Sequence, residues 1–164
     1  MFVDGARLGY GLAANGNDLT FVDLARLTDV FYIGGTKVGA MFGEAVVLSN
    51  SDIARDFRFL IKQKGGMLAK GWLLGAQFEA LFTDDLYWHI CRHANAMADR
   101  IRDVLARHDV PLFVDTVTNQ VFPVLPDTVL EHLKANFSFS EQQRVDENHR
   151  AVRFCTSWAT TQEN

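Results

Sequence analysis

The order of short apolar runs and one helical run near the start of the chain constrains the fold most strongly. Residues 1–3 have the pattern of the end of a buried parallel strand, and residues 29–33 and 43–49 are further strand-like runs. Between the first two runs, residues 17–20 form a helix cap and residues 19–27 place leucine and valine at helical spacing. A strand, a helix and a strand at this spacing predict a βαβ unit of an α/β sheet.

The sequence becomes helical after residue 50. We expect helices over residues 52–62, 67–82 and 86–106, and Pro111 prevents any continuation of the third helix. The apolar stripe expected on the core side of the third helix consists of Leu86, Ile90, Met97, Ile101, Val104 and Leu105. The sequence therefore predicts a long amphipathic helix in the middle of the chain.

The remainder of the chain has the pattern of a small α+β unit. Residues 112–114, 120–125 and 151–156 have the composition of strands, and Pro126 opens a helix that ends near Ala135. We expect the boundary between the two parts of the chain to lie within the long helix. The predicted fold class is therefore α/β, followed by a small α+β domain.

Composition and charge exclude several classes of protein. The chain has 164 residues, of which 48% are hydrophobic and 22% are charged, which is typical of a globular protein. Its formal net charge of −4 argues against nucleic acid as a partner. No apolar run approaches the roughly 18 residues needed to span a bilayer, and no secretion signal is present. Cys91 and Cys155 fit reduced thiols, so we expect a cytoplasmic protein.

Three residues carry the strongest chemical signal. Asp4 and Arg7 follow the first strand-like run, and Lys37 lies in a glycine-hinged loop directly after residues 29–33. A carboxylate, a guanidinium and a loop lysine are the parts needed to hold pyridoxal phosphate (PLP). In such a site the lysine forms a Schiff base, and the carboxylate keeps the pyridine nitrogen protonated so that the ring accepts electrons.

Simpler interpretations exist for each of these features. A single loop lysine is usually solvated, and an aspartate at a strand end is often a local cap. The loop at residues 34–37 lacks the spacing of a P-loop, so a nucleotide-phosphate site is not predicted. His89 and His93 share a helix face, but Cys91 points away from them, so we predict a solvated helix face and no metal site.

Four segments, taken in order, resemble one family over nearly the whole chain. They are residues 4–9, 31–37, 65–72 and 153–160, with the sequences DGARLG, FYIGGTK, GGMLAKGW and RFCTSWAT. Together they resemble the PLP-dependent threonine aldolases and the wider β-eliminating lyase family, which have the aspartate aminotransferase-like fold. No one segment would be specific alone, but four in the family's order are.

The resemblance implies a domain organisation. Residues 1–85 would be the C-terminal portion of a fold type I (PLP-transferase-type) large domain, and residues 86–164 a small α+β C-terminal domain that is truncated at its end. In the family, the residue that stacks on the cofactor ring and most of the phosphate cradle precede the position of Asp4. The resemblance therefore implies a fragment that lacks the N-terminal part and, in isolation, binds PLP poorly or not at all.

The resemblance also implies a role for each matched residue. Lys37 would form the Schiff base and act as a general base when substrate displaces it, and Asp4 would pair with the pyridinium nitrogen. Arg7 would lie by the ring hydroxyl or the substrate carboxylate, and Thr36 would offer its hydroxyl to the cofactor phosphate. Arg153 would clamp the substrate carboxylate, with a structural ion pair as the competing interpretation.

The reaction implied is cleavage of a β-hydroxy-α-amino acid of the L-threonine class to glycine and an aldehyde. Two alternatives remain open: another PLP reaction on the same fold, such as β-elimination or transamination, and an inactive fragment that serves only as an assembly unit. A small-molecule amino acid substrate and a homo-oligomer are expected, with neither nucleic acid nor a membrane as partner.

Overall fold

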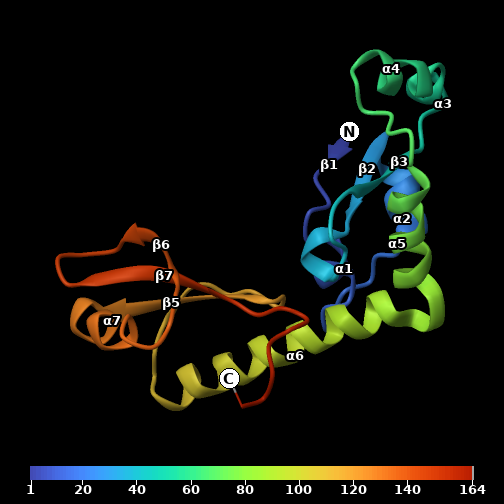
Figure 1. Ribbon diagram of the computed structural model, residues 1–164. Coiled ribbons are helices and arrows are strands. Elements are labelled where there is room, and N and C mark those ends of the chain that lie inside the picture. The colour runs from blue at the N-terminus through green and yellow to red at the C-terminus, as the bar shows by residue number, and fades with distance from the viewer. Residues whose placement is uncertain (164) are drawn as a thin grey trace. The chain divides into compact units, whose positions relative to one another are not determined.

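The computed structural model describes residues 1–163, which fall into two compact units, Met1–Cys91 and Arg92–Asn164. The first unit contains β1 (Phe2–Val3), α1 (Leu8–Leu12), α2 (Phe21–Leu27), β2 (Val30–Gly34), the 3₁₀ turn η1 (Thr36–Val38), β3 (Glu44–Leu48), α3 (Ser51–Ala54), α4 (Phe57–Gln63), α5 (Trp72–Phe82), the 3₁₀ turn η2 (Thr83–Asp85) and the start of α6 (Leu86–Arg107) (Figure 1). The second contains the rest of α6, β4 (Leu112–Val114), β5 (Gln120–Pro126), α7 (Asp127–Leu133), β6 (Ser140–Arg144) and β7 (His149–Cys155). Within residues 1–163, no helix combines the length and the apolar character needed to cross a membrane.

The sheet of the first unit has the strand order β1-β2-β3. β1 is parallel to β2, with Val3 opposite Phe31, and α2 connects the two strands, which confirms the predicted βαβ unit. β3 is antiparallel to β2 and ends the sheet. The expected burial of the first strand is wrong for Phe2, whose side chain is exposed and touches the ring of Tyr32, at 6.0 Å between ring centroids.

α2 begins where the sequence predicts, because Thr20 and Asp23 form a capping box. The Thr20 hydroxyl accepts from the Asp23 N–H, and the Asp23 carboxylate accepts from the Thr20 N–H at 2.9 Å. The predicted apolar face is only partly correct. Leu24 is buried, but Val22 and Leu27 are exposed, because Phe21 is the residue of α2 that packs against the aromatic rings of the unit.

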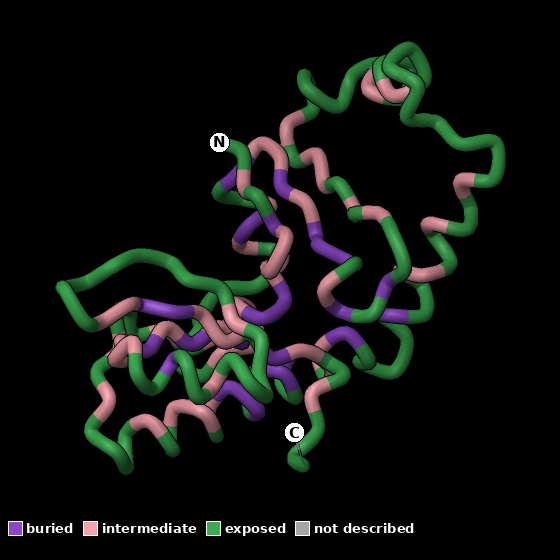
Figure 2. Tube along the Cα trace, turned by 60° about the vertical axis from the view of Figure 1, so that its left-hand side comes forward, coloured by how far each residue is buried: buried purple, intermediate pink, exposed green. Residues whose placement is uncertain are grey.

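The first two helices predicted after residue 50 differ from those in the structure. The expected single helix over residues 52–62 is divided into α3 and α4 at Asp56, whose φ of 60° is incompatible with a continuous right-handed helix. α5 begins at Trp72 instead of residue 67, after a turn that contains Gly65 at φ 77°. Most of residues 51–73 are exposed, as the green stretch of the trace in Figure 2 shows.

The long helix α6 is confirmed, and its predicted apolar stripe is partly correct, because Met97 is buried and Ile90, Ile101 and Leu105 are half-buried. Leu86 and Val104 are exposed, whereas the buried positions are Tyr87, Cys91, Ala94, Asn95, Met97 and Ala98. Small residues on this face allow close approach of the neighbouring backbone, which outweighs the side-chain hydrophobicity on which the sequence pattern depends. The helix is preceded by η2, where Asp84 and Asp85 have positive φ.

The second unit is a four-stranded antiparallel sheet with the order β4-β5-β7-β6. The predicted strands and the helix after Pro126 are confirmed as β4, β5, β7 and α7. β6 was not predicted, because all five of its residues are polar and exposed, so it carries no alternating apolar signal. Leu125, Leu130 and Val152 form the core of this unit.

Candidate functional site

The ends of β1 and β2 meet at one edge of the first unit's sheet. The Gly34 N–H donates to the Gly5 carbonyl at 3.0 Å, so the segments that follow the two strands are in direct backbone contact. A Cβ at Gly34 would lie 2.7 Å from the Ala6 carbonyl oxygen, and one at Gly5 would lie 1.5 Å from that of Tyr32. Glycine is therefore required at both positions. The contact places the Asp4 and Lys37 segments side by side at the carboxyl ends of parallel strands, where α/β sheets commonly bind ligands.

The Asp4 carboxylate is held by its neighbours. Its Oδ1 accepts from the Ala6 N–H at 3.0 Å. The Tyr32 hydroxyl donates to the same carboxylate and is the main reason that the pKa of Asp4 is lowered, with the Ala6 N–H and the charge of Lys37 acting in the same direction. The same contact raises the pKa of Tyr32 to about 12. Asp4 is therefore an ionised and oriented acceptor.

Lys37 lies in a tight loop built around η1. The N–H groups of Val38 and Ala40 both donate to the Gly35 carbonyl at 3.0 Å, and Gly39 closes the loop at φ 101°. The Lys37 side chain is half-buried. Its main-chain carbonyl accepts a hydrogen bond from the Tyr10 hydroxyl. The position of the lysine is therefore set by main-chain contacts inside the loop and by α1.

Three polar residues at this edge were missed by the sequence reasoning: Tyr10, Tyr32 and Glu44. Glu44 lies opposite Gly34 in the β2–β3 ladder, and the Gly35 N–H donates to its carboxylate. Partial desolvation raises the pKa of Glu44, and the charge of Lys37 opposes this effect. Pairing of the two predicted strands could have placed Glu44 at this edge, because β3 is the next strand after β2 and pairs with it antiparallel. The sequence has no signal for the two tyrosines.

Arg7 and Thr36 lie in the same unit as Asp4 and Lys37. Arg7 precedes α1 and is half-buried, and its Nε is buried with no hydrogen-bond partner among residues 1–163. A buried guanidinium N–H without an acceptor favours an anionic partner. Thr36 is exposed at the start of η1.

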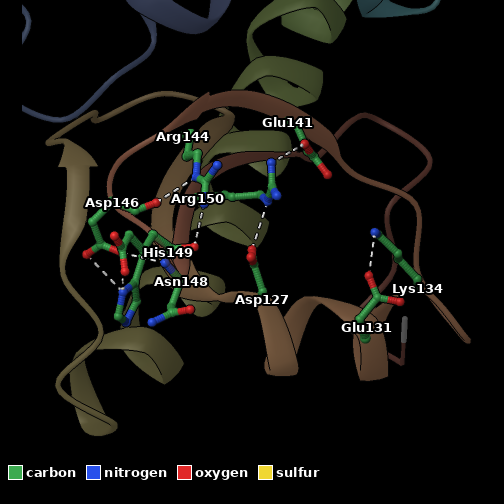
Figure 3. Close-up of polar contacts among 10 residues, drawn as sticks. Asp127, Glu131, Lys134, Glu141, Arg144, Asp146, Asn148, His149 and Arg150 are labelled. Carbon is green, nitrogen blue, oxygen red and sulfur yellow. Dashed lines mark hydrogen bonds and ion pairs between the residues drawn. The ribbon is translucent and has the colours of Figure 1, made fainter.

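Arg153 lies on β7 in the second unit. It is half-buried, stands opposite Ser140 of β6, and donates from Nη2 to the Ser140 Oγ at 3.2 Å. The ion pairs of β7 belong to other residues. Arg150 pairs with Asp127 at 2.8 Å and with Glu141 at 3.4 Å, the contacts drawn as dashed lines in Figure 3. In the part of the chain that the structure describes, the guanidinium of Arg153 has no carboxylate partner.

The histidines and cysteine of α6 do not form a cluster. Cys91 is buried, whereas the His93 Nε2 lies 2.7 Å from the Thr160 carbonyl oxygen. The described residues contain no group of three or more His, Cys, Asp or Glu side chains that would hold a metal ion.

Comparison with known proteins gives a consistent result. No protein-family model matches the sequence. The fold matches that of a threonine aldolase from Leishmania major with a TM-score of 0.95 and 43% sequence identity, over 99% of this chain and 47% of the other. Two low-specificity L-threonine aldolases are each 31% identical to this chain. The protein from Pseudomonas aeruginosa matches over 98% of this chain, and the one from a second Pseudomonas strain over 82%.

Over nearly its whole length, the chain matches part of a threonine aldolase. It spans 46% of the length of the P. aeruginosa protein and 39% of the other Pseudomonas protein, which is about half or less of each. The similarity also confirms the predicted fold class, that of fold type I PLP enzymes.

The residues of this chain fit PLP. Asp4 is an ionised acceptor suited to a protonated ring nitrogen, and Lys37 supplies a primary amine from the adjacent loop. The buried Arg7 Nε lacks an acceptor, which an anionic group of a ligand would provide. The donors and acceptors at this edge therefore match the chemistry of the cofactor that the sequence predicted.

Proposed function

We propose that the chain is part of a PLP-dependent aldehyde-lyase of the threonine aldolase type, which cleaves a β-hydroxy-α-amino acid of the L-threonine class to glycine and an aldehyde. The observation that carries the proposal is the meeting of Asp4 and Lys37 at the ends of adjacent parallel strands, in a chain of this family. Because the chain spans about half of its relatives, the activity is proposed for the whole protein.

Each matched residue has a proposed role. Lys37 binds the cofactor covalently, Asp4 binds the ring nitrogen, and Thr36 contributes its hydroxyl to the phosphate. Arg7 binds the ring hydroxyl or the substrate carboxylate, and Arg153 binds the substrate carboxylate. When bound, PLP supplies a ring that withdraws electrons from the carbon at which the substrate is cleaved.

The chain's own residues supply orientation and proton control. Tyr32 and the Ala6 N–H both donate to Asp4, which lowers its pKa further and orients the carboxylate, so it presents a fixed negative charge. The Lys37 Nζ takes up and returns a proton. It interacts electrostatically with the carboxylates of Asp4 and Glu44. Arg153 retains donors for bidentate carboxylate binding, because the Ser140 hydroxyl is the one hydrogen-bond partner of its guanidinium among the described residues.

The remaining expectations are also proposals. Residues 1–85 are assigned to the cofactor-binding domain and residues 86–164 to the small C-terminal domain. The protein is proposed to be cytoplasmic and homo-oligomeric, with an amino acid as substrate and neither nucleic acid nor a membrane as partner. The alternatives are β-elimination or transamination at the same residues, or an inactive assembly unit.

Lys37→Ala in the full-length protein tests the proposal, with Lys134→Ala as the matched control, since Lys134 is an exposed lysine paired with Glu131. After incubation with PLP and borohydride, wild type and Lys134→Ala are expected to carry the cofactor on the peptide that contains Lys37. Lys37→Ala is expected to carry none and to lose cleavage of L-threonine.

The products decide between the reactions. Glycine and an aldehyde support the aldolase, whereas a 2-oxo acid and ammonia from L-threonine indicate β-elimination. Covalent loading of Lys37→Ala at the wild-type level would remove Lys37 from its proposed role. Loading without any turnover would favour the assembly unit.

A further inference from the structure

Tyr10 connects α1 to the loop that carries Lys37. Its hydroxyl donates to the main-chain carbonyl of Lys37, 27 residues further along the chain. The Tyr10 side chain is only 1% exposed, so both its ring and its hydroxyl are inside the unit. A buried carbonyl in a loop needs a donor, and here the donor comes from a helix instead of the loop itself.

The helix that carries Tyr10 is itself firmly placed. A Cβ at Gly9 would lie 2.4 Å from the Tyr87 hydroxyl and 2.6 Å from the Cys91 sulfur, so α1 packs directly on the start of α6. The Leu8 N–H donates to the Gly5 carbonyl at 3.0 Å, which connects α1 to the segment that follows Asp4. Tyr10 therefore contacts the Lys37 loop from an element that is fixed on two sides.

Val38 packs in the core at 2% exposure, whereas the hydrogen bonds inside the loop only close the turn on itself. Val38 and Ala40 both donate to one carbonyl, that of Gly35, and Gly39 follows Val38 in a left-handed conformation that favours glycine. These bonds define the shape of the turn, but they do not connect residue 37 to the rest of the unit. The bond from Tyr10 makes that connection.

We propose that Tyr10 is a positioning residue for Lys37. Its hydroxyl fixes the main chain at Lys37 and so keeps the lysine amine at the sheet edge that carries Asp4. The inference rests on the proposed role of Lys37. The positioning of Lys37 is assigned to the hydroxyl of Tyr10, and the ring of Tyr10 contributes packing only.

The matched variants are Tyr10→Phe and Tyr87→Phe in the full-length protein. Each removes one buried hydroxyl and keeps the ring, and Tyr87 packs on Gly9 without a bond to the Lys37 loop. The first measurement is hydrogen exchange of the cofactor-free protein, followed at the Val38 and Ala40 amides. Loss of one hydrogen bond is expected to speed their exchange about fivefold to tenfold in Tyr10→Phe. No such change is expected in Tyr87→Phe.

The second measurement is covalent trapping on Lys37 at sub-saturating PLP. The lysine amine condenses with the cofactor aldehyde with loss of water, and borohydride reduces the product to a stable secondary amine. Tyr10→Phe is expected to give about fivefold to tenfold less adduct than wild type and Tyr87→Phe at equal cofactor. Thermal melting of both variants shows whether each is folded under the assay conditions.

The outcomes separate the two claims. Wild-type exchange and wild-type trapping in Tyr10→Phe would overturn the role of Tyr10 and leave the proposed function intact. Equal effects of Tyr10→Phe and Tyr87→Phe would also overturn it, because they would indicate general loosening of the unit. Absence of any adduct on Lys37 in wild type would overturn the proposed function, and this inference with it.

Discussion

Asp4 is an exposed carboxylate whose properties depend on a residue of the neighbouring strand. The parallel register that sets Val3 opposite Phe31 brings Asp4 beside Tyr32, and the tyrosine hydroxyl lowers the pKa of the carboxyl. An aspartate that is anchored in this way keeps its charge and its orientation without burial. Tyr32 thus supports the ring-nitrogen role proposed for Asp4.

Tyr32→Phe is expected to raise the pKa of Asp4 toward the ordinary value near 4, measured by NMR titration of the carboxyl carbon. Because the folded pKa is lowered, the stabilising contribution is present above about pH 4 and is lost as the pH falls through the lowered value. The melting temperatures of variant and wild type should therefore differ most at neutral pH and converge in acid. An unchanged Asp4 titration in the variant would contradict the contact.

Arg153 and Arg150 form a matched pair on β7. Arg150→Leu removes the partner of Asp127 and Glu141 and is expected to lower the melting temperature modestly, since these ion pairs are partly exposed. Arg153→Leu is expected to leave thermal melting nearly unchanged and to lower kcat/KM for L-threonine about 30- to 150-fold. Melting curves and steady-state kinetics of both full-length variants make the comparison. The reverse pattern would identify Arg153 as the structural cation.

At the scale of elements, the site depends on how closely two loops approach. β1 and β2 are held together by backbone hydrogen bonds, and their following segments touch through Gly5 and Gly34. Both positions require glycine, because a Cβ at either one would collide with backbone atoms. Main-chain contact of this kind fixes the separation of the Asp4 and Lys37 segments more firmly than side-chain packing does.

Gly34→Ala is expected to destabilise the full-length protein by about 1–3 kcal/mol in urea denaturation, because its Cβ meets the Ala6 and Gly5 carbonyl oxygens. It should also weaken PLP binding, since the two loops must separate. Gly75→Ala is the control: no atom lies within 4 Å of its added Cβ inside α5, so it should stabilise by about 0.5–1 kcal/mol. Equal effects of the two substitutions would show that the contact at Gly34 is unimportant.

At the scale of the whole molecule, the first unit leaves large apolar side chains in contact with solvent. Met41, Phe59 and Trp72 are 84%, 74% and 68% exposed, and they belong to segments that contribute little to the unit's core. Apolar surface of this extent favours association with another chain. It supports the proposed homo-oligomer.

We expect the chain to sediment as an oligomer at low micromolar concentration. The double substitution Phe59→Glu and Trp72→Glu should shift the chain to a smaller species, because the two glutamates place charge at exposed apolar positions. Val117→Glu, at an exposed apolar position of the second unit, is the control and should leave the sedimentation unchanged. A wild-type chain that sediments as a clean monomer would contradict the prediction.

Local sequence signals were enough to predict several elements and the candidate site. Strand composition predicted β1 and β2, and the Thr20 cap predicted the start of α2. The spacing of Asp4, Arg7 and Lys37, together with the family resemblance, predicted the candidate site. Local signals failed where the backbone took an unusual conformation, as at Asp56, and where a strand had no apolar face, as in β6.

Contacts between side chains that are distant in the sequence depend on the tertiary fold. Tyr32 reaches Asp4 because two strands pair in one register, and Tyr10 reaches Lys37 because α1 packs on the start of α6. The buried positions of α6 likewise include Tyr87, Ala94 and Asn95, which lie outside the predicted apolar stripe. Such contacts join residues far apart in the chain and depend on strand register and helix rotation, which composition and spacing do not encode.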